Sequence, residues 1–333
     1  MDFSKKSVLI TGGTGSFGRS YVKKLLSTNV ERVVVFSRDE MKQWDMAHEL
    51  KDSRLRFFIG DVRDRDRLKR SLSGIDYVVH SAAMKIVPMA EYNPIECIKT
   101  NIHGAVNVIE ASLDVGVKKV VALSTDKASS PINLYGATKL ASDKLFCSAN
   151  SYSSQSGPIF AVVRYGNVMG SRGSVLPFFA SLDPKAEFPI TDPRMTRFMI
   201  DMKDAVGLVD KAFHEMVGGE IFVKKTKSMN ILDIASAFSK DFSYNVIGVR
   251  EGEKLHEQMI SIEDARTTFS YDGYYKILPD MFDWQKCSKR IGIGKPVQED
   301  FSYSSEKNSE WMSTKELRAW LKNNLNFQGS FSE

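Results

Sequence analysis

The chain has 333 residues, of which 42% are hydrophobic and 26% are charged, and its formal net charge at pH 7 is +5. This length and composition are those of a soluble globular protein with a full hydrophobic core. The positive charge is mild and dispersed, which favours small anionic ligands and argues against a nucleic-acid-binding face, and no apolar run reaches the roughly 20 residues that a membrane-spanning helix requires.

The N-terminal segment predicts a dinucleotide-binding unit. An apolar strand at residues 7–10 runs into a glycine-rich loop and then into a helical pattern. Glycines in such a loop permit a tight turn, close approach of the backbone to a pyrophosphate and close packing of helix on strand. A glycine-rich turn without a ligand is the alternative, but this loop follows a strand and opens a helix. The expected cofactor contacts here are Gly12, Thr14, Gly15, Ser16, Phe17 and Gly18.

The end of the second strand bears on the choice between NAD and NADP. Enzymes that select NAD usually place an acidic residue there to bind the ribose 2′-hydroxyl. This chain instead has Ser37 and Arg38, with Lys42 one turn later. These side chains suit a 2′-phosphate, so the sequence predicts NADP. Asp39 keeps NAD open, because its carboxylate could reach the ribose.

Strands alternate with helical patterns over the first two-thirds of the chain. This alternation predicts an α/β fold with a doubly wound parallel sheet of the Rossmann type. The expected strands are residues 7–11, 32–37, 55–60, 76–80, 119–124, 159–164 and 219–223.

Residues 124–139 carry the strongest chemical pattern. Tyr135 and Lys139 are four residues apart and share one face of a predicted helix. A nearby ammonium lowers the pKa of a phenol from its ordinary value of about 10, so Tyr135 is expected to accept a proton from a substrate hydroxyl as hydride leaves the same carbon. The neighbouring Asp126 and Lys127 are not needed for that oxidation. They therefore indicate a further acid–base step.

The composition of the sequence changes after about residue 168. Segment 169–194 is rich in Gly, Pro and Ser, as expected of loops that close over a ligand. Near the end, Ser313 and Glu316 form a capping box that predicts a docked terminal helix. We therefore expect two domains, both discontinuous in sequence. Residues 1–168 and 195–228 would bind the cofactor, and the smaller domain, residues 169–194 and 229–333, would bind the substrate.

Cysteine and histidine usage predicts a cytoplasmic protein without metal. Cys97, Cys147 and Cys287 are odd in number and widely spaced, which suggests neither a disulfide framework nor a zinc site. The five histidines do not cluster with cysteines or carboxylates at ligand spacing. Residues 1–6 are polar and the first strand follows at once, so we expect no secretory signal.

These motifs resemble the extended short-chain dehydrogenases/reductases, and most closely the inverting UDP-N-acetylglucosamine 4,6-dehydratases of pseudaminic-acid synthesis in flagellin-glycosylating bacteria. The similarity extends through nearly the whole chain. Lys127 stands where the retaining soluble dehydratases have glutamate, and Tyr135 stands where their membrane-bound relatives have methionine. The blocks that carry the resemblance are residues 11–18, 37–40, 60–64, 91–94, 124–127, 133–139, 164–167, 170–174, 195–198 and 251–257.

The resemblance implies an NADP-dependent, homo-oligomeric lyase that converts UDP-N-acetylglucosamine to a 4-keto-6-deoxy sugar nucleotide with inverted C5. Tyr135 and Lys139 would oxidise C4, which makes the C5 hydrogen acidic. Lys127 would then remove the C5 proton while Asp126 protonates the departing C6 hydroxyl. Hydride would return to C6, and C5 would be reprotonated on the opposite face. Thr125 would hydrogen-bond the C4 oxygen or Tyr135.

The charge states required of the acid–base pair are unusual, because Lys127 must be neutral and Asp126 protonated. One internal proton transfer separates that form from the ordinary ion pair, so the two groups should titrate together. We expect burial, Lys139 and an oxidised nicotinamide to push Lys127 toward neutrality. Neighbours on a regular strand point to opposite faces, so the strand must end by Asp126 if both side chains are to face the sugar.

Further ligand contacts are expected after the third and fourth strands and in the second half of the chain. Asp61 and Val62 would flank adenine. Lys85 would contact cofactor or substrate, or be a solvated loop charge. Arg172 and Arg197 would clamp the UDP diphosphate bidentately, or be surface ion pairs. The remaining expected contacts are Ala82 and Ala83 beside the cofactor ribose and diphosphate, Asn167 on cofactor or sugar, and Glu253 on the uridine ribose.

Two other functions remain open at this point. A nucleotide-sugar C4 epimerase or dehydrogenase would use Tyr135 and Lys139 only and would leave Asp126 and Lys127 without a task. A non-catalytic NADP-sensing regulator on the same fold would generally have lost the tyrosine–lysine pair, which this chain retains.

Overall fold

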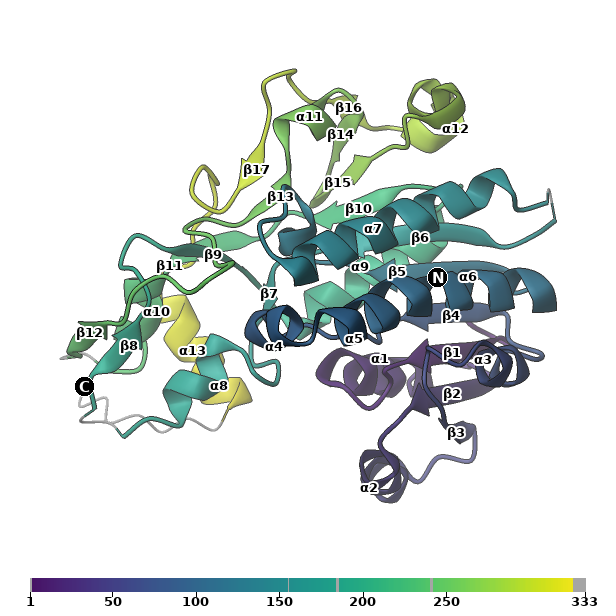
Figure 1. The fold of residues 1–333 in the computed structure, drawn as a ribbon, viewed down its shortest axis with the longest axis horizontal. Coiled ribbons are helices and arrows are strands. Elements are labelled where there is room, and N and C mark those ends of the chain that lie inside the picture. The colour runs from purple at the N-terminus through teal and green to yellow at the C-terminus, as the bar shows by residue number, and fades with distance from the viewer. Residues whose placement is uncertain (1, 155, 184–185, 240–241, 326–333) are drawn as a thin grey trace.

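A ten-stranded mixed sheet forms the centre of the protein (Figure 1). The structure is a computed structural model that describes residues 2–154, 156–183, 186–239 and 242–325. Seven neighbouring strands of this sheet are parallel, and three antiparallel strands extend it beyond β10. The parallel strands, in spatial order, are β3 (Leu55–Ile59), β2 (Arg32–Ser37), β1 (Ser7–Thr11), β4 (Tyr77–His80), β5 (Lys119–Leu123), β6 (Ile159–Arg164) and β10 (Ile221–Lys224).

The predicted parallel strands are all confirmed, with ends that differ by no more than two residues. Their sequences are continuous apolar runs because helices cover both faces of the sheet. Along β1, Val8 and Ile10 belong to one hydrophobic core and Leu9 to the other. A doubly wound sheet is therefore confirmed.

Two layers of helices build these cores (Figure 1). Side chains of α1, α2 and α9 contribute to the core that contains Val8, and side chains of α3, α6 and α7 contribute to the core that contains Leu9. The helices of this part are α1 (Ser16–Leu26), α2 (Glu40–Leu50), α3 (Arg65–Ser71), α4 (Val87–Tyr92), α5 (Pro94–Ile98), the π-helix η1 (Lys99–His103), α6 (Gly104–Val115), α7 (Leu134–Ser148), the 3-10 turn η3 (Ala149–Ser151) and α9 (Met202–Glu215).

The three antiparallel strands come from the segment that the sequence assigned to substrate binding. β15 (Tyr274–Ile277) pairs with β10, β14 (Thr268–Tyr271) with β15, and β16 (Lys295–Pro296) with β14. Residues 272–273, Asp-Gly, form the two-residue turn of the β14–β15 hairpin, which is a common hairpin signal. The large sheet therefore continues across the boundary expected at residue 229, and the division into two binding domains stays a prediction.

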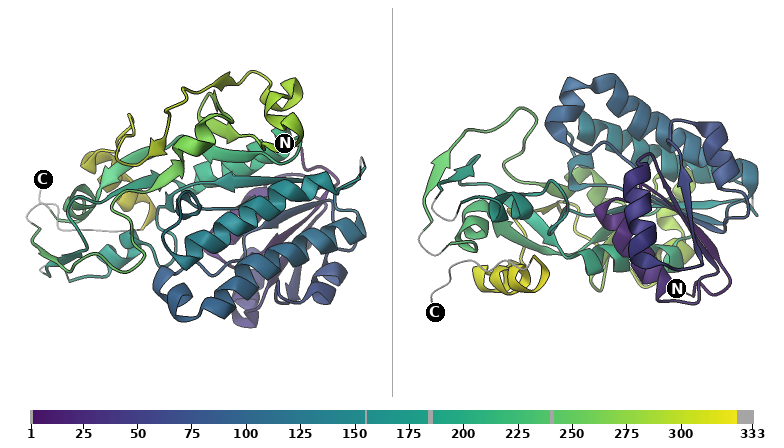
Figure 2. Two further views of the ribbon diagram at one scale, coloured as in Figure 1. Left: turned by 45° about the horizontal axis from the view of Figure 1, so that its top comes forward. Right: turned by 90° about the horizontal axis from the view of Figure 1, so that it is seen from below.

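A smaller unit lies to one side of the large sheet (Figure 2). It has its own hydrophobic core, built around Leu176, Phe188, Met229 and Leu317. The predicted capping box of Ser313 and Glu316 opens α13, and that part of the prediction is confirmed. The elements here are β7 (Asn167–Val168), α8 (Val175–Ala180), β8 (Phe188–Ile190), β9 (Thr196–Ile200), β11 (Lys227–Asn230), α10 (Ile231–Ser236), β12 (Tyr244–Val246) and α13 (Thr314–Asn324).

Three short elements connect this unit to the antiparallel strands: β13 (Gln258–Ile260), α11 (Ile262–Ala265) and β17 (Tyr303–Ser304). The 3-10 helix η4 (Met281–Lys286) and α12 (Ser288–Ile291) lie between β15 and β16. None of the helices in the described ranges combines the length and the apolar character that crossing a membrane would demand.

Candidate active site

The glycine-rich loop has the geometry that a dinucleotide site requires. Gly12 has a positive φ of 65°, and a Cβ there would lie 2.9 Å from the backbone of Ala82. A Cβ at Gly18 would lie 2.5 Å from Gly13 Cα, so helix and loop touch directly. Gly15 is the N-cap of α1, and no side chain caps this helix N-terminus, where a phosphate could accept hydrogen bonds. Thr14, Ser16 and Phe17 lie in the same turn.

The end of β2 holds its acidic residue in place. Asp39 is the N-cap of α2 and accepts a hydrogen bond of 3.0 Å from the Lys42 backbone N–H, and its carboxylate also forms an ion pair with Lys42 Nζ. The Ser37 hydroxyl accepts from Gln43 Nε2 at 2.9 Å. Arg38 has a 64% exposed side chain, 3.9 Å from the Asp61 carboxylate. Asp39 and Lys42 thus neutralise each other, and Arg38 faces solvent beside Asp61.

Several predicted cofactor residues meet at the carboxyl ends of β1 and β4. Thr11 Oγ1 accepts from the backbone N–H of Ala82 at 3.2 Å. Lys85 Nζ donates to the Arg172 carbonyl at 3.0 Å, and the Arg172 N–H donates to Ser16 Oγ at 3.2 Å. The loop containing Arg172 therefore touches both the glycine-rich loop and the segment after β4.

Burial differs among three of the predicted cofactor contacts, Asp61, Val62 and Ala83. Val62 is buried against Gly104, whereas the Asp61 carboxylate is held by two hydrogen bonds from the Arg63 guanidinium at 2.9 and 2.7 Å. Ala83 is exposed. That these residues contact a cofactor stays a prediction.

The acid–base pair lies just beyond β5. This strand ends at Leu123, and Asp126 begins the 3-10 helix η2 (Asp126–Ala128), as the pair requires. Lys127 Nζ is 3.2 Å from Asp126 Oδ1, so the two side chains turn toward each other. The Thr125 hydroxyl donates to the same oxygen at 3.0 Å. Asp126 is buried, and its Oδ2 has no hydrogen-bond partner among the described residues.

Tyr135 and Lys139 lie in α7, whose N-cap is Asn133 and whose first turn packs on η2. Both are buried, with exposures of 8% and 3%. Burial raises the pKa of Tyr135 to about 12, although Lys127 and a hydrogen bond with Thr125 act in the opposite direction. The expectation that Lys139 lowers the pKa of Tyr135 is therefore wrong for this state of the protein, because desolvation of the phenolate dominates.

Lys139 has a carboxylate on its far side. Burial lowers the pKa of the Lys139 ammonium, and Asp143, one helical turn further along α7, opposes that shift. Asp143 is itself fixed by Arg164 at 3.0 Å and by the Ser124 hydroxyl at 2.7 Å. Lys139 is thus held on the face of α7 that carries Tyr135, as predicted from their spacing.

Glu257 is a further member of the site that the sequence did not single out. Glu257 is the residue before β13, and its Oε1 lies 2.9 Å from Lys127 Nζ. The run from Glu251 to Glu257 contains three carboxylates, and nothing in their spacing shows which one faces Lys127. This acidic run was the only signal for Glu257 in the sequence.

The surroundings of Lys127 keep its amine protonated, which contradicts the expectation that they push it toward neutrality. Burial alone would lower its pKa, but Asp126 and Glu257 together raise it above its ordinary range. Arg197, and not Lys139 as predicted, is the cation that opposes them. Burial raises the pKa of Asp126, and the charge of Glu257 adds to that effect. Glu257 itself has a lowered pKa, because Lys127 and Arg197 outweigh its burial.

The predicted substrate contacts are spread over β7, β9 and the segment before β13. Arg197 is buried and donates to the carbonyls of Leu255 at 2.9 Å and Lys254 at 3.1 Å, and it lies 3.7 Å from Glu253. Asn167 begins β7, and Arg172 is exposed. Arg197 therefore holds the segment that carries Glu253, and its role as a diphosphate clamp stays a prediction.

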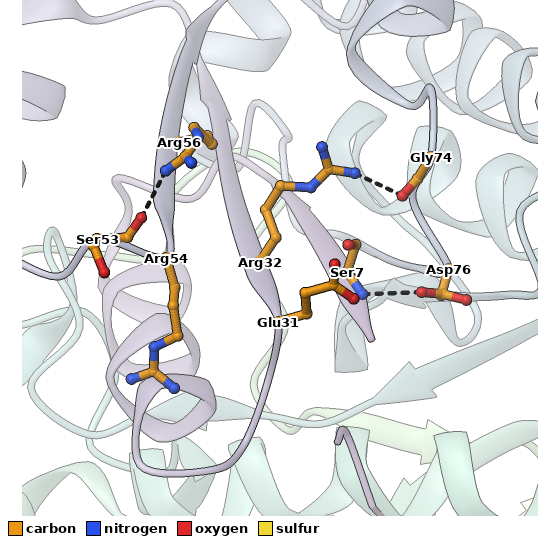
Figure 3. A pocket seen from close by; sticks show the side chains of 8 residues that line it. All are labelled: Ser7, Glu31, Arg32, Ser53, Arg54, Arg56, Gly74 and Asp76. Atoms are coloured by element: carbon orange, nitrogen blue, oxygen red, sulfur yellow. Dashed lines mark hydrogen bonds between the residues drawn. The ribbon is translucent and has the colours of Figure 1, made fainter. Parts of the chain in front are cut away.

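A surface hollow lies at the amino ends of the parallel strands (Figure 3). It is bordered by the amino ends of β1 and β2 and includes Arg32, Arg56 and Asp76. The Arg32 guanidinium donates to the Gly74 carbonyl at 2.7 Å. Ligands of open α/β sheets bind outside the carboxyl ends of the strands, so this hollow is separate from the candidate active site.

Known proteins resemble this chain over most of its length. Residues 8–279 match a family model described as polysaccharide biosynthesis protein. A protein of Campylobacter jejuni subsp. jejuni serotype O:2 named UDP-N-acetylglucosamine 4,6-dehydratase (inverting) is 53% identical, covering 95% of this chain and 97% of its own. A protein of Rickettsia prowazekii named UDP-glucose 4-epimerase is 40% identical, covering 96% of each chain.

Solved structures agree with the fold. The X-ray structure of Pen from Bacillus thuringiensis is 36% identical with a TM-score of 0.89, covering 98% of this chain and 99% of its own. DesIV, a dTDP-glucose 4,6-dehydratase from Streptomyces venezuelae solved with NAD, is 24% identical with a TM-score of 0.68, covering 75% of this chain and 86% of its own. The extended short-chain dehydrogenase/reductase fold predicted from the sequence is confirmed, and the chain belongs to the family of polysaccharide biosynthesis proteins.

Proposed function

We propose that this protein is an inverting UDP-N-acetylglucosamine 4,6-dehydratase. The observation that carries the proposal is the contact between half-buried Lys127 and buried Asp126, 3.2 Å apart just beyond β5. A base and an acid on one side of the site are what loss of water across C5 and C6 requires. The identity of 53% with the Campylobacter jejuni relative of that name supports the same substrate.

The site residues fit a nicotinamide cofactor. Gly12 packs so closely on the backbone of Ala82 that any Cβ at position 12 would collide with it, so the tight turn expected of a pyrophosphate-binding loop requires glycine there. When bound, a nicotinamide supplies the acceptor and donor of hydride for C4 and C6. Gly15 and Ser16, at the N-terminus of α1, would hold its phosphates. Asn167 and Lys85 would contact the nicotinamide side and the sugar.

The chain's own residues would move the protons. Tyr135, which lies near Thr125, would accept the C4 hydroxyl proton as a phenolate, with Lys139 and the positive charge of a bound oxidised nicotinamide lowering its pKa. Lys139 would also bind the cofactor ribose. One internal proton transfer from the Lys127 ammonium to Asp126 would first give the reactive pair. Lys127 would then take the C5 proton, and Asp126 would give its proton to the C6 hydroxyl, which leaves as water. The burial of Asp126, which raises its pKa, supports its role as the acid.

We further propose NADP as the cofactor, because Asp39 is occupied by the cap of α2 and by Lys42. Arg38, on the loop after β2, would then meet the 2′-phosphate. In Arg38→Ala we expect the Kd for NADPH to rise about tenfold, with little change for NADH, since one charge-assisted contact is lost. Titration of protein fluorescence would measure both. Arg56→Ala is the matched control, because Arg56 borders the hollow at the amino ends of the strands. An equal loss for both cofactors would contradict the NADP proposal.

The product would enter bacterial surface-glycan synthesis, such as the pseudaminic-acid route to flagellin glycosylation. We also propose that the protein works in the cytoplasm as a homo-oligomer. Arg172, Arg197 and Glu253 would bind the UDP part of the substrate. Arg197 lies 3.7 Å from Glu253, and the Arg172 N–H donates to Ser16 Oγ, so these residues border the 253–257 segment and the glycine-rich loop.

A C4 epimerase is the second candidate, because the Rickettsia prowazekii relative carries that name. An epimerase changes configuration without changing mass, whereas a dehydratase removes one water. Mass spectrometry of the product from UDP-N-acetylglucosamine separates the two.

An isotope experiment tests the proposed reaction. With deuterium at C4 of UDP-N-acetylglucosamine, we expect the label at C6 of the product, and in heavy water we expect solvent deuterium at C5. Proton NMR would read both positions and the inverted configuration at C5. Loss of the C4 label to solvent, or a product of unchanged mass, would refute the dehydratase.

A further inference from the structure

Glu257 is a buried carboxylate without an assigned role in the reaction. It is 1% exposed, and its Oε1 lies 2.9 Å from Lys127 Nζ. Its other oxygen, Oε2, has no hydrogen-bond partner within the described part of the chain. Burying a carboxylate with an unsatisfied oxygen is costly. Such a group calls for an explanation beyond packing.

The Lys127 amine lies between two buried carboxyl groups. Asp126 Oδ1 is 3.2 Å from the same nitrogen, and Asp126 Oδ2 also lacks a partner in the described ranges. The two carboxyls differ in their other neighbours. Arg197 Nε is 3.9 Å from Glu257 Oε1, which keeps Glu257 ionised. A proton shared by this cluster therefore resides more readily on Asp126 than on Glu257.

We propose that Glu257 is a positioning residue that holds the Lys127 amine against the substrate and, because it stays ionised, leaves Asp126 as the carboxyl that receives the proton of the pair and gives it to the leaving group. The proposal rests on the dehydratase function. In the elimination, the C5–H bond breaks, its proton goes to Lys127 Nζ, and its electron pair forms the C5–C6 double bond. The C6–O bond breaks, and the hydroxyl leaves as water with the proton of Asp126. The ammonium created at Lys127 then meets a carboxylate already in place.

The charge of Glu257 predicts a direction for the pH dependence. The active form holds one proton on the Asp126–Lys127 pair, so activity falls at low pH when a second proton binds and at high pH when the first is lost. A negative charge nearby raises both apparent pKa values. Removing it moves both limbs of the pH profile to lower pH. The charged or titratable groups that face Glu257 or the pair are Asp126, Lys127, Tyr135, Arg197 and Lys254.

The test is the pH profile of kcat in Glu257→Gln, which keeps the size of the side chain and removes its charge. We expect kcat at the wild-type optimum to fall about 10²-fold, and the whole bell to move about one pH unit toward acid. Glu306→Gln is the matched control, because Glu306 faces His256 beside Glu257 and is exposed. Its rate and profile should stay those of the wild type.

An unchanged kcat in Glu257→Gln would overturn the proposal, and so would a slower enzyme whose bell stays in place, since a merely structural role would not shift it. If Glu257→Gln does not fold, Glu257→Asp carries the test. It withdraws the charge from Lys127 by one methylene, so its bell should lie on the acid side of the wild type. A bell in the wild-type position would overturn the proposal. Failure of the wild-type protein to dehydrate UDP-N-acetylglucosamine would instead refute the proposed function.

Discussion

Lys127→Ala is expected to stop the loss of water while leaving oxidation at C4 intact. Tyr135 and Lys139 lie on α7 and do not depend on the Lys127 side chain for their positions, whereas no other amine of the described site lies as close to Asp126. Removing a general base typically costs 10²–10⁴-fold, so we expect product formation to fall about 10³-fold. Reduced nicotinamide should still accumulate with UDP-N-acetylglucosamine, which absorbance would follow.

The control for this variant is Lys225→Met, which removes a lysine that follows β10 and donates to Ser270 of β14 at 2.9 Å. It should leave turnover unchanged. Full product formation by Lys127→Ala would refute the assignment of the base. Loss of C4 oxidation together with dehydration would mean that Lys127 is needed before the elimination, contrary to the proposed sequence of steps.

Gly136→Ala should disable the site by pushing apart the two elements that build it. A Cβ on Gly136 would lie 2.2 Å from the Lys127 carbonyl oxygen and 3.1 Å from Pro131 Cβ. Neither is the end of a flexible side chain, so α7 must move away from η2. We expect the free energy of unfolding to fall by about 1–3 kcal/mol. Because a shift of about 1 Å at reacting groups can cost 10²-fold, we expect a comparable loss of kcat.

Gly207→Ala is the matched control, since Gly207 also lies inside a helix, α9, but a Cβ there meets nothing within 4 Å. Alanine at that position should raise the free energy of unfolding by up to about 1 kcal/mol. Denaturant unfolding and steady-state kinetics would compare the two variants. Equal stability and full activity in Gly136→Ala would contradict the tight contact between α7 and η2.

The sequence predicted the parallel sheet, the shared face of Tyr135 and Lys139 and the proximity of Asp126 and Lys127 because all of these are local signals. Strands such as β2 are buried on both faces and read as unbroken apolar runs. Tyr135 and Lys139 share a face through helical periodicity alone. Lys127 and Asp126 are adjacent, and only the end of β5 at Leu123 had to be supplied by the structure.

Features that depend on distant parts of the chain could not be predicted in the same way. Glu257 meets Lys127 across 130 residues of sequence, and no periodicity connects them. The pKa of Tyr135 depends on how completely the fold buries it, which a sequence does not reveal. The β14–β15 hairpin had an Asp-Gly turn signal, but its short strands lie in a segment that otherwise resembles loops.

The pairing of β15 on β10 makes the parallel part of the large sheet dependent on residues far downstream. Without 268–277, the backbone of Ile221–Lys224 would present a row of unpaired donors and acceptors at an open sheet edge, which invites association with other chains. The seven parallel strands are therefore no autonomous module. A chimera with the C-terminal third of a relative, or the first two-thirds expressed alone, would need another strand to pair with β10. It would also need to restore any specificity that was lost.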